Sequence, residues 1–141
     1  MELSEALPLL TDNHTAVATT IGSSGKAQST IVTTGWVDEE LCWISRGRTI
    51  KVKNIEHTGR ATVTVIKLDT RRYITIEGPA VIHPWPEGNT DAHIKLLKDV
   101  YIAMGRTPTA TDAEFAVTMA DEKRIVIAVK PESVYGSLTQ R

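Results

Sequence analysis

Apolar and β-branched residues alternate with polar ones along most of this sequence, which is the spacing of side chains on one face of a β-strand. Six stretches follow the pattern: residues 14–22, 27–37, 41–45, 60–68, 71–84 and 124–136. Short polar segments such as residues 23–26 and 38–40 are typical of tight turns between neighbouring strands. The pattern predicts a mainly β, α+β fold with six antiparallel strands.

Four segments change to a helical spacing. Residues 5–12 predict a short leading helix, and residues 47–58 and 89–104 predict two more. A fourth helix begins with a capping box, in which Thr111 is the N-cap and Glu114 the third helical residue, and it extends to about residue 120. Helices inserted between antiparallel strands favour a small β-barrel with helical connections.

The composition fits one globular domain over residues 1–141, with a net charge of -1 and 41% hydrophobic residues. No segment approaches the roughly 18 apolar residues of a membrane span. The first residues are acidic where a secretory signal would be basic. We therefore expect a soluble, cytoplasmic protein without a membrane partner.

Cysteine and histidine are too sparse to indicate metal or nucleophilic chemistry. Cys42 is the only cysteine, which excludes an internal disulfide and a cysteine-based zinc site, so we interpret it as a small buried hydrophobe. The four histidines are scattered, without the spacing of a metal motif or a catalytic triad. We predict no metal site and no catalytic side chain.

Four cations lie within eight positions in the segment SRGRTIKVKNI, residues 45–55. If a helix begins near Gly47, a rotation of about 100° per residue places Arg48 and Lys51 together on the inward side. Cations in a first turn oppose the helix dipole, whereas free N–H groups there attract an anion. Two interpretations remain open: a phosphate site that includes Ser45, or solvated side chains whose stems cover apolar surface.

The same segment resembles the phosphate-binding segment of the split β-barrel flavin- and deazaflavin-binding family related to pyridoxamine 5'-phosphate oxidase. The resemblance extends over nearly the whole chain, through HTAVATTIGSSGKAQSTIVTTGWV, RATVTV, YITIEGPAVI and RIVIAVKPESVYG. It implies a six-stranded antiparallel split β-barrel. It also implies a homodimer with two cofactor sites at the subunit interface.

The resemblance further implies which residues bind the cofactor. The implied phosphate contacts are Ser45, Arg46, Arg48 and Lys51, with Asn54 in support. The strand implied to line the ring, mostly through its backbone, contains Gln28, Ser29, Thr30, Ile31 and Val32. Arg71, Arg72 and Arg106 are either contacts to a cofactor tail or solvated surface charges.

The ending VKPESVYGSLTQR lacks the arginine-rich strand of true pyridoxamine-phosphate oxidases and is closer to the subgroup that uses coenzyme F420. The implied function is an F420H2-dependent oxidoreductase that transfers a hydride between the deazaflavin C5 and an unsaturated or conjugated organic acceptor. One alternative is an FMN-binding protein related to pyridoxamine-phosphate oxidase. Another is a carrier or sensor that holds FMN, haem or a deazaflavin without turnover. Nucleic-acid binding is disfavoured by the net charge of -1 and by the absence of aromatic residues in the basic segment.

Overall fold

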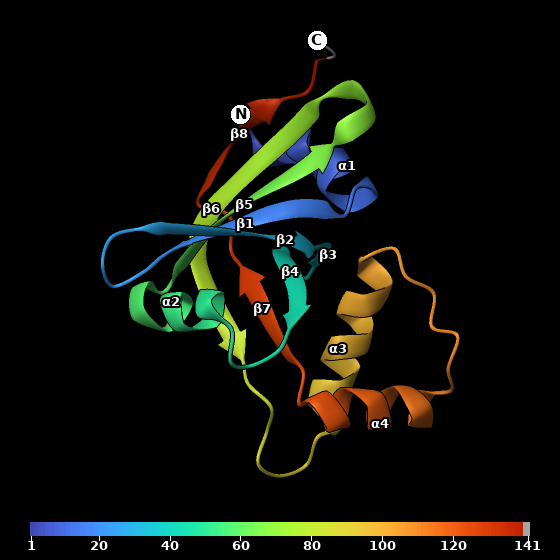
Figure 1. Ribbon diagram of the computed structural model, residues 1–141. Coiled ribbons are helices and arrows are strands. Elements are labelled where there is room, and N and C mark those ends of the chain that lie inside the picture. The colour runs from blue at the N-terminus through green and yellow to red at the C-terminus, as the bar shows by residue number, and fades with distance from the viewer. Residues whose placement is uncertain (140–141) are drawn as a thin grey trace.

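A computed structural model describes residues 1–139 (Figure 1). These residues form eight strands, four α-helices and one short 3-10 helix. In chain order the elements are α1 (Leu3–Asp12), β1 (Thr15–Ile21), β2 (Ala27–Thr33), β3 (Gly35–Val37), β4 (Glu40–Ser45), α2 (Ile50–Thr58), β5 (Arg60–Lys67), η1 (Leu68–Thr70), β6 (Arg72–His83), α3 (Asp91–Ala103), α4 (Asp112–Glu122), β7 (Ile125–Val129) and β8 (Ser133–Ser137).

The strands form an antiparallel half-barrel in which β6 connects the two halves. Seven strands follow the order β2-β1-β5-β6-β7-β4-β3, and β8 pairs with β6. One edge of β6 pairs with β5 over residues 72–79. The other edge pairs with β8 over residues 73–77 and with β7 over residues 80–83. The predicted α+β class and the antiparallel arrangement are confirmed.

The predicted number of six strands was wrong, because two expected strands are each divided. Residues 27–37 separate at Thr34 into β2, which pairs with β1, and β3, which pairs with β4. Gly35 lies directly against α3, since a Cβ atom there would be 2.7 Å from Ala103. The last expected strand divides around Pro131, which has no N–H to donate to a strand ladder.

Gly78 allows β6 to pass the connection between β7 and β8. A Cβ atom at Gly78 would lie 1.9 Å from the carbonyl oxygen of Lys130. The backbone N–H groups of Lys130 and Glu132 donate to the carbonyl oxygens of Pro79 and Glu77, each at 2.9 Å. A side chain at this position would separate the two segments and break these bonds.

Two apolar clusters hold the fold together. The larger one lies between the sheet, α1 and α2, and the smaller one lies between β4, β7, α3 and α4. Trp43 is 1% exposed in the larger cluster. Cys42 is buried in the smaller one, and this burial raises the pKa of its thiol to about 12, so its interpretation as a buried hydrophobe is confirmed.

The predicted helices are present, with α2 starting later than expected. The predicted N-cap Thr111 of α4 is confirmed, because the backbone N–H of Glu114 donates to Thr111 Oγ1 at 3.2 Å. The Glu114 carboxylate accepts from the Thr111 hydroxyl at 3.0 Å, and not from its backbone N–H as in a full capping box. The amphipathic segment forms α3, with Leu97 and Val100 fully buried. In residues 1–139, no helix combines the length and the apolar character that a membrane span requires.

Candidate functional site

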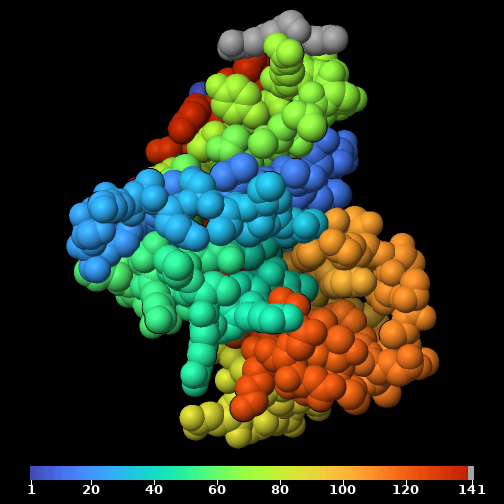
Figure 2. All heavy atoms as spheres, in the orientation of Figure 1, coloured from blue at the N-terminus to red at the C-terminus, as the bar shows by residue number. Residues whose placement is uncertain are grey.

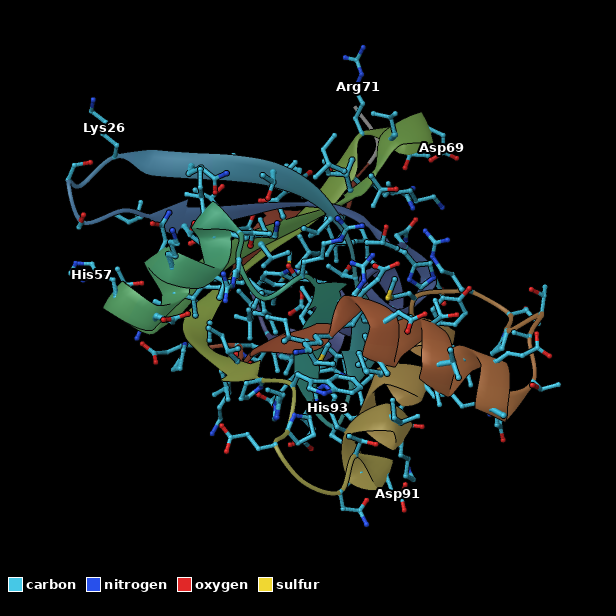
Figure 3. All side chains as sticks on the ribbon, turned by 60° about the horizontal axis from the view of Figure 1, so that its bottom comes forward. Lys26, His57, Asp69, Arg71, Asp91 and His93 are labelled. Carbon is cyan, nitrogen blue, oxygen red and sulfur yellow. The ribbon has the colours of Figure 1, made fainter. Side chains whose placement is uncertain are left out.

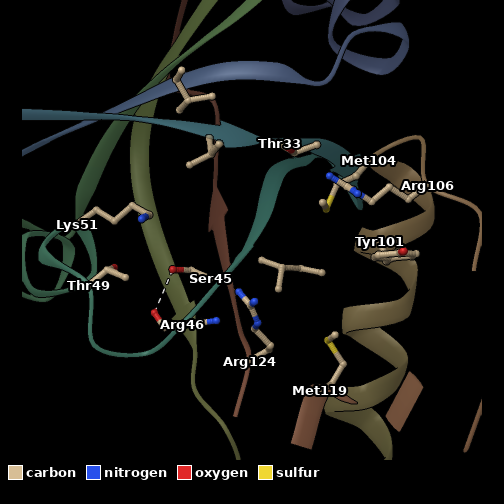
Figure 4. A pocket seen from close by; sticks show the side chains of 13 residues that line it. Thr33, Ser45, Arg46, Thr49, Lys51, Tyr101, Met104, Arg106, Met119 and Arg124 are labelled. Carbon is tan, nitrogen blue, oxygen red and sulfur yellow. Dashed lines mark hydrogen bonds between the residues drawn. The ribbon is translucent and has the colours of Figure 1, made fainter. Parts of the chain in front are cut away.

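An open cleft of about 490 Å³ lies between β2, the β4–α2 connection and the two last helices (Figure 4). On the molecular surface these segments meet on the face shown in Figure 2. The cleft combines four cations with hydroxyl groups and a set of apolar side chains. Its lining residues are Ile31, Val32, Thr33, Ile44, Ser45, Arg46, Thr49, Lys51, Tyr101, Met104, Arg106, Met119 and Arg124.

The β4–α2 connection differs from the sequence prediction. Helix α2 begins at Ile50, because Thr49 is its N-cap and accepts a hydrogen bond from the N–H of Val52 at 3.4 Å. Arg48 therefore precedes the helix, and it is exposed. The prediction that Arg48 faces inward beside Lys51 was wrong, because it counted helical turns from too early a residue.

Lys51 is the cation that α2 directs into the cleft (Figure 4). The neighbouring residue Val52 and, one turn after Lys51, Ile55 are each 2% exposed. These two side chains anchor α2 to the core and thereby fix the direction of Lys51. Partial burial lowers the pKa of the Lys51 ammonium below its ordinary value. Among residues 1–139, no hydrogen bond or ion pair compensates this ammonium.

Two arginines meet at the end of α4. Arg46 Nη2 lies 3.6 Å from Glu122 Oε2, and Arg124 forms a closer ion pair with the same carboxylate oxygen. Arg46 follows β4 and Arg124 precedes β7, which are neighbouring strands in the sheet. The hydroxyl of Ser45 is buried and donates to the carbonyl oxygen of Arg46 at 3.0 Å (Figure 4).

The structure brings only part of the predicted cofactor-binding set together. The predicted residues that line the cleft are Ile31, Val32, Ser45, Arg46 and Lys51. Arg48 instead lines an adjacent cavity of about 720 Å³, which shares Arg46 with the cleft and also includes Trp85. Asn54 points to β1, where its amide donates to Thr20 Oγ1 at 3.1 Å. The cofactor roles of these residues stay predictions.

The remaining predicted residues lie along β2 before the cleft. Gln28 Oε1 and Thr30 Oγ1 are buried without a hydrogen-bond partner in the structure. They are two positions apart and therefore share one face of the strand. Ser29, on the opposite face, forms a hydrogen bond of 2.8 Å with Thr19. Two unpaired polar atoms on one strand face are a feature that a ligand would satisfy.

Sequence reasoning missed the side of the cleft that lies far along the chain. The helical spacing of residues 89–104 did not indicate that Tyr101 and Met104, which also pack in the smaller apolar cluster, line the cleft from α3 and its end. Nothing in the sequence pattern indicated that Arg124 belongs to the site. It precedes β7, and only the fold shows that β7 pairs with β4. Arg106 lines the cleft, whereas Arg71 lies at the far β5–β6 hairpin (Figure 3).

No family model matches the sequence, and no curated protein matches it. Solved structures do match. An F420 reductase shares 24% identity, with 91% of this chain and 94% of that chain covered and a TM-score of 0.65. A conserved hypothetical protein from Mycobacterium tuberculosis shares 20% identity, with coverages of 96% and 84% and a TM-score of 0.73.

A third structure is a pyridoxamine 5'-phosphate oxidase-related, FMN-binding protein from Nostoc punctiforme. It shares 16% identity, with 95% of this chain and 80% of that chain covered and a TM-score of 0.66. At these identities the likeness establishes the fold. The split β-barrel predicted from the resemblance to flavin- and deazaflavin-binding proteins is thereby confirmed.

Proposed function

We propose that the protein is an F420H2-dependent oxidoreductase that transfers a hydride between the deazaflavin C5 and an unsaturated or conjugated organic acceptor. The observation that carries the proposal is the partly buried ammonium of Lys51, which has no partner among residues 1–139 and lies in a cleft with three arginines. Desolvating a cation costs free energy, which a bound anion would offset. The split-barrel likeness to an F420 reductase supports the choice of ligand.

The cationic side of the cleft fits the phosphate of the cofactor. Lys51 approaches it from α2, Arg46 from just after β4 and Arg124 from just before β7, and the N-terminus of α2 adds the positive end of its dipole. Guanidinium groups form charge-assisted, two-pronged hydrogen bonds with phosphate oxygens. Phosphate binding would thus bring together cations from three separate elements.

The rest of the cleft fits a planar ring. Ile44, Met104 and Met119 supply apolar contact, and Tyr101 lies beside them on α3 (Figure 4). Methionine adapts to the shape of an aromatic partner. On β2, beyond the lining of the cleft, the buried oxygens of Gln28 and Thr30 lack a partner among the described residues and would accept hydrogen bonds from a ring N–H group that reached them.

The protein's contribution to the reaction is to bind, orient and desolvate. When bound, the cofactor supplies the hydride chemistry. The cations fix the phosphate end, and the apolar side chains exclude water and hold the acceptor against the ring face. No proton donor or acceptor side chain is required for this role.

We propose that the functional unit is a homodimer. The outer face of the sheet carries the row Ile31, Val17, Thr64, Thr75 and Tyr135 across five paired strands. Ile31 is 79% exposed and Tyr135 is 53% exposed. An uncharged row that ends in two exposed apolar side chains is suited to cover by a second copy. Because Ile31 also lines the cleft, that copy would complete the cofactor site.

FMN is the alternative cofactor, because the same cations would bind its phosphate. Titration of the protein with F420 and with FMN, followed by fluorescence, ranks the two. Lys51→Glu should weaken binding of the cofactor at least tenfold, by reversing a charge that contacts phosphate. Lys53→Glu is the matched control, since Lys53 is exposed on the same helix. Equal effects of the two substitutions would contradict the proposed phosphate position.

Turnover separates an oxidoreductase from a carrier. Reduced F420 is mixed with the protein and a panel of enone, quinone and tetrapyrrole acceptors, and its oxidation is followed by absorbance. An oxidoreductase oxidises the cofactor at a rate that depends on the acceptor. Saturable binding without acceptor-dependent oxidation would instead identify a cofactor carrier.

A further inference from the structure

We propose that Glu122 is an internal anion, which holds the two arginines at the end of α4 until the phosphate of the cofactor displaces it. The inference rests on the proposed function of the cleft. It concerns Arg46, one of the residues implied to bind phosphate, and its carboxylate partner. In this arrangement the protein's own side chain and the ligand compete for the same guanidinium groups.

The geometry gives one carboxylate two cationic partners. Oε2 of Glu122 pairs with Nη2 of Arg46 at 3.6 Å and, more closely, with Nη2 of Arg124. Both arginines line the cleft, whereas Glu122 lines the adjacent cavity that shares Arg46. Glu122 thus draws the two guanidinium groups together at the boundary between the cleft and that cavity.

Without these arginines, the end of α4 would be an unfavourable position for the Glu122 carboxylate. Glu122 is the last residue of α4, and Lys123 caps the helix in a left-handed conformation with φ of 46°. A carboxylate at this end is unfavourable, because it opposes the negative end of the helix dipole. Asp121 beside it adds a second negative charge. The arginines offset this cost, so a carboxylate here is explained by its pairing.

The pair with Arg46 is weak enough to exchange. The side chain of Arg46 is 69% exposed and that of Glu122 is 35% exposed. Ion pairs with this access to solvent contribute little. A phosphate that offers several acceptor oxygens replaces the single carboxylate oxygen at modest cost. The carboxylate can return as phosphate leaves, which weakens binding and speeds release.

The test compares Glu122→Gln with Asp121→Asn in the intact 141-residue chain. Both substitutions remove one negative charge from the same end of α4, but in the described part of the chain Asp121 forms no ion pair. The probes are FMN, F420, riboflavin, which has the FMN ring without phosphate, and inorganic phosphate. Dissociation constants come from fluorescence titration for the first three and from NMR of the arginine Nε–H groups for phosphate.

We expect Glu122→Gln to bind FMN or F420 about 3- to 10-fold more tightly, as removal of one solvent-screened competitor implies. Asp121→Asn should change either affinity less than twofold, and riboflavin should bind both variants like the original protein. Equal tightening in the two variants, or tightening for riboflavin, overturns the inference but leaves the proposed function intact.

The two proposals can fail separately. If no flavin or deazaflavin binds, the proposed function is wrong, and inorganic phosphate then decides on Glu122. Tighter phosphate binding by Glu122→Gln alone supports the internal anion, and unchanged or absent phosphate binding overturns it. If Glu122→Gln does not fold, phosphate is added to the original protein and the arginine Nε–H signals are followed by NMR. Its Arg46 and Arg124 Nε–H signals must both shift on phosphate addition, and static signals overturn the inference.

Discussion

Lys51 carries its charge at a place where the fold supplies no described anion. Replacing it with methionine keeps an unbranched side chain that is one atom shorter and removes the cost of desolvating an ammonium. We expect Lys51→Met to unfold at higher urea concentration at pH 7, with a gain of about 0.5 kcal/mol, while its cofactor affinity falls. A residue selected for ligand binding should show this trade of stability for function.

The dependence on pH follows from the lowered pKa of Lys51. Because the unfolded chain keeps its ordinary pKa of 10.5, it binds more protons than the folded protein between the two values. The original protein therefore gains stability as the pH rises towards 10.5, and Lys51→Met does not. The stability advantage of Lys51→Met over the original protein, measured by urea unfolding, should therefore be smaller at pH 10 than at pH 7. A constant difference would show that desolvation of the ammonium is not the cause.

Glu77 illustrates the opposite case. Arg60 holds its carboxylate with two hydrogen bonds of 2.7 and 2.9 Å and thereby lowers the pKa of Glu77. A carboxylate with a lowered pKa stabilises the fold above its unfolded pKa, and this contribution disappears as the pH falls through the folded pKa. Glu77→Gln should cost about 0.5 kcal/mol at pH 7, the value of a solvent-screened pair, and less at pH 3, which lies below the ordinary pKa of the carboxyl. Urea unfolding at both pH values measures this, and an equal loss at both would refute it.

At the scale of elements, β6 depends on one glycine. Gly78→Ala places a Cβ atom 1.9 Å from a backbone oxygen, which the chain avoids only by moving the β7–β8 connection. We expect a loss of more than about 3 kcal/mol or failure to fold. Gly88→Ala is the control, since nothing lies within 4 Å of its added Cβ atom. Thermal unfolding compares the two, and similar midpoints would mean that the connection yields easily.

The strand pattern predicted where strands lie, but the position of their breaks depends on their partners. Thr34 ends β2 because the chain moves there from β1 to β4, and no local pattern reports such a change. Pro131 did carry a local signal, since a residue without an N–H interrupts a ladder. The start of α2 was also readable, because Thr49 is a good N-cap. Counting from Gly47 instead led to the wrong orientation of Arg48.

At the scale of the whole molecule, the cleft joins segments that are distant in sequence. Its basic segment was predicted from a cluster of cations at a helix start and from the family resemblance, whereas β2 was predicted from the resemblance alone. Met119 and Arg124 were not identified, because only the packing of α4 and β7 beside β4 brings them there. Local spacing predicts which face of an element is buried, and it contains no information on which distant face it meets.

The last prediction concerns assembly. If the outer sheet face forms the dimer, Tyr135→Lys should place a charge in the interface and shift the protein from dimer to monomer in sedimentation velocity. Tyr135 lies four strands from β2 and outside the cleft, so a loss of cofactor affinity in this variant would arise from the lost partner. Val117→Lys is the matched control, since Val117 is 60% exposed on α4 and Tyr135 is 53% exposed. The Val117→Lys variant should remain dimeric and bind the cofactor with unchanged affinity. An original protein that is monomeric and binds the cofactor with full affinity would show that one chain completes the site alone.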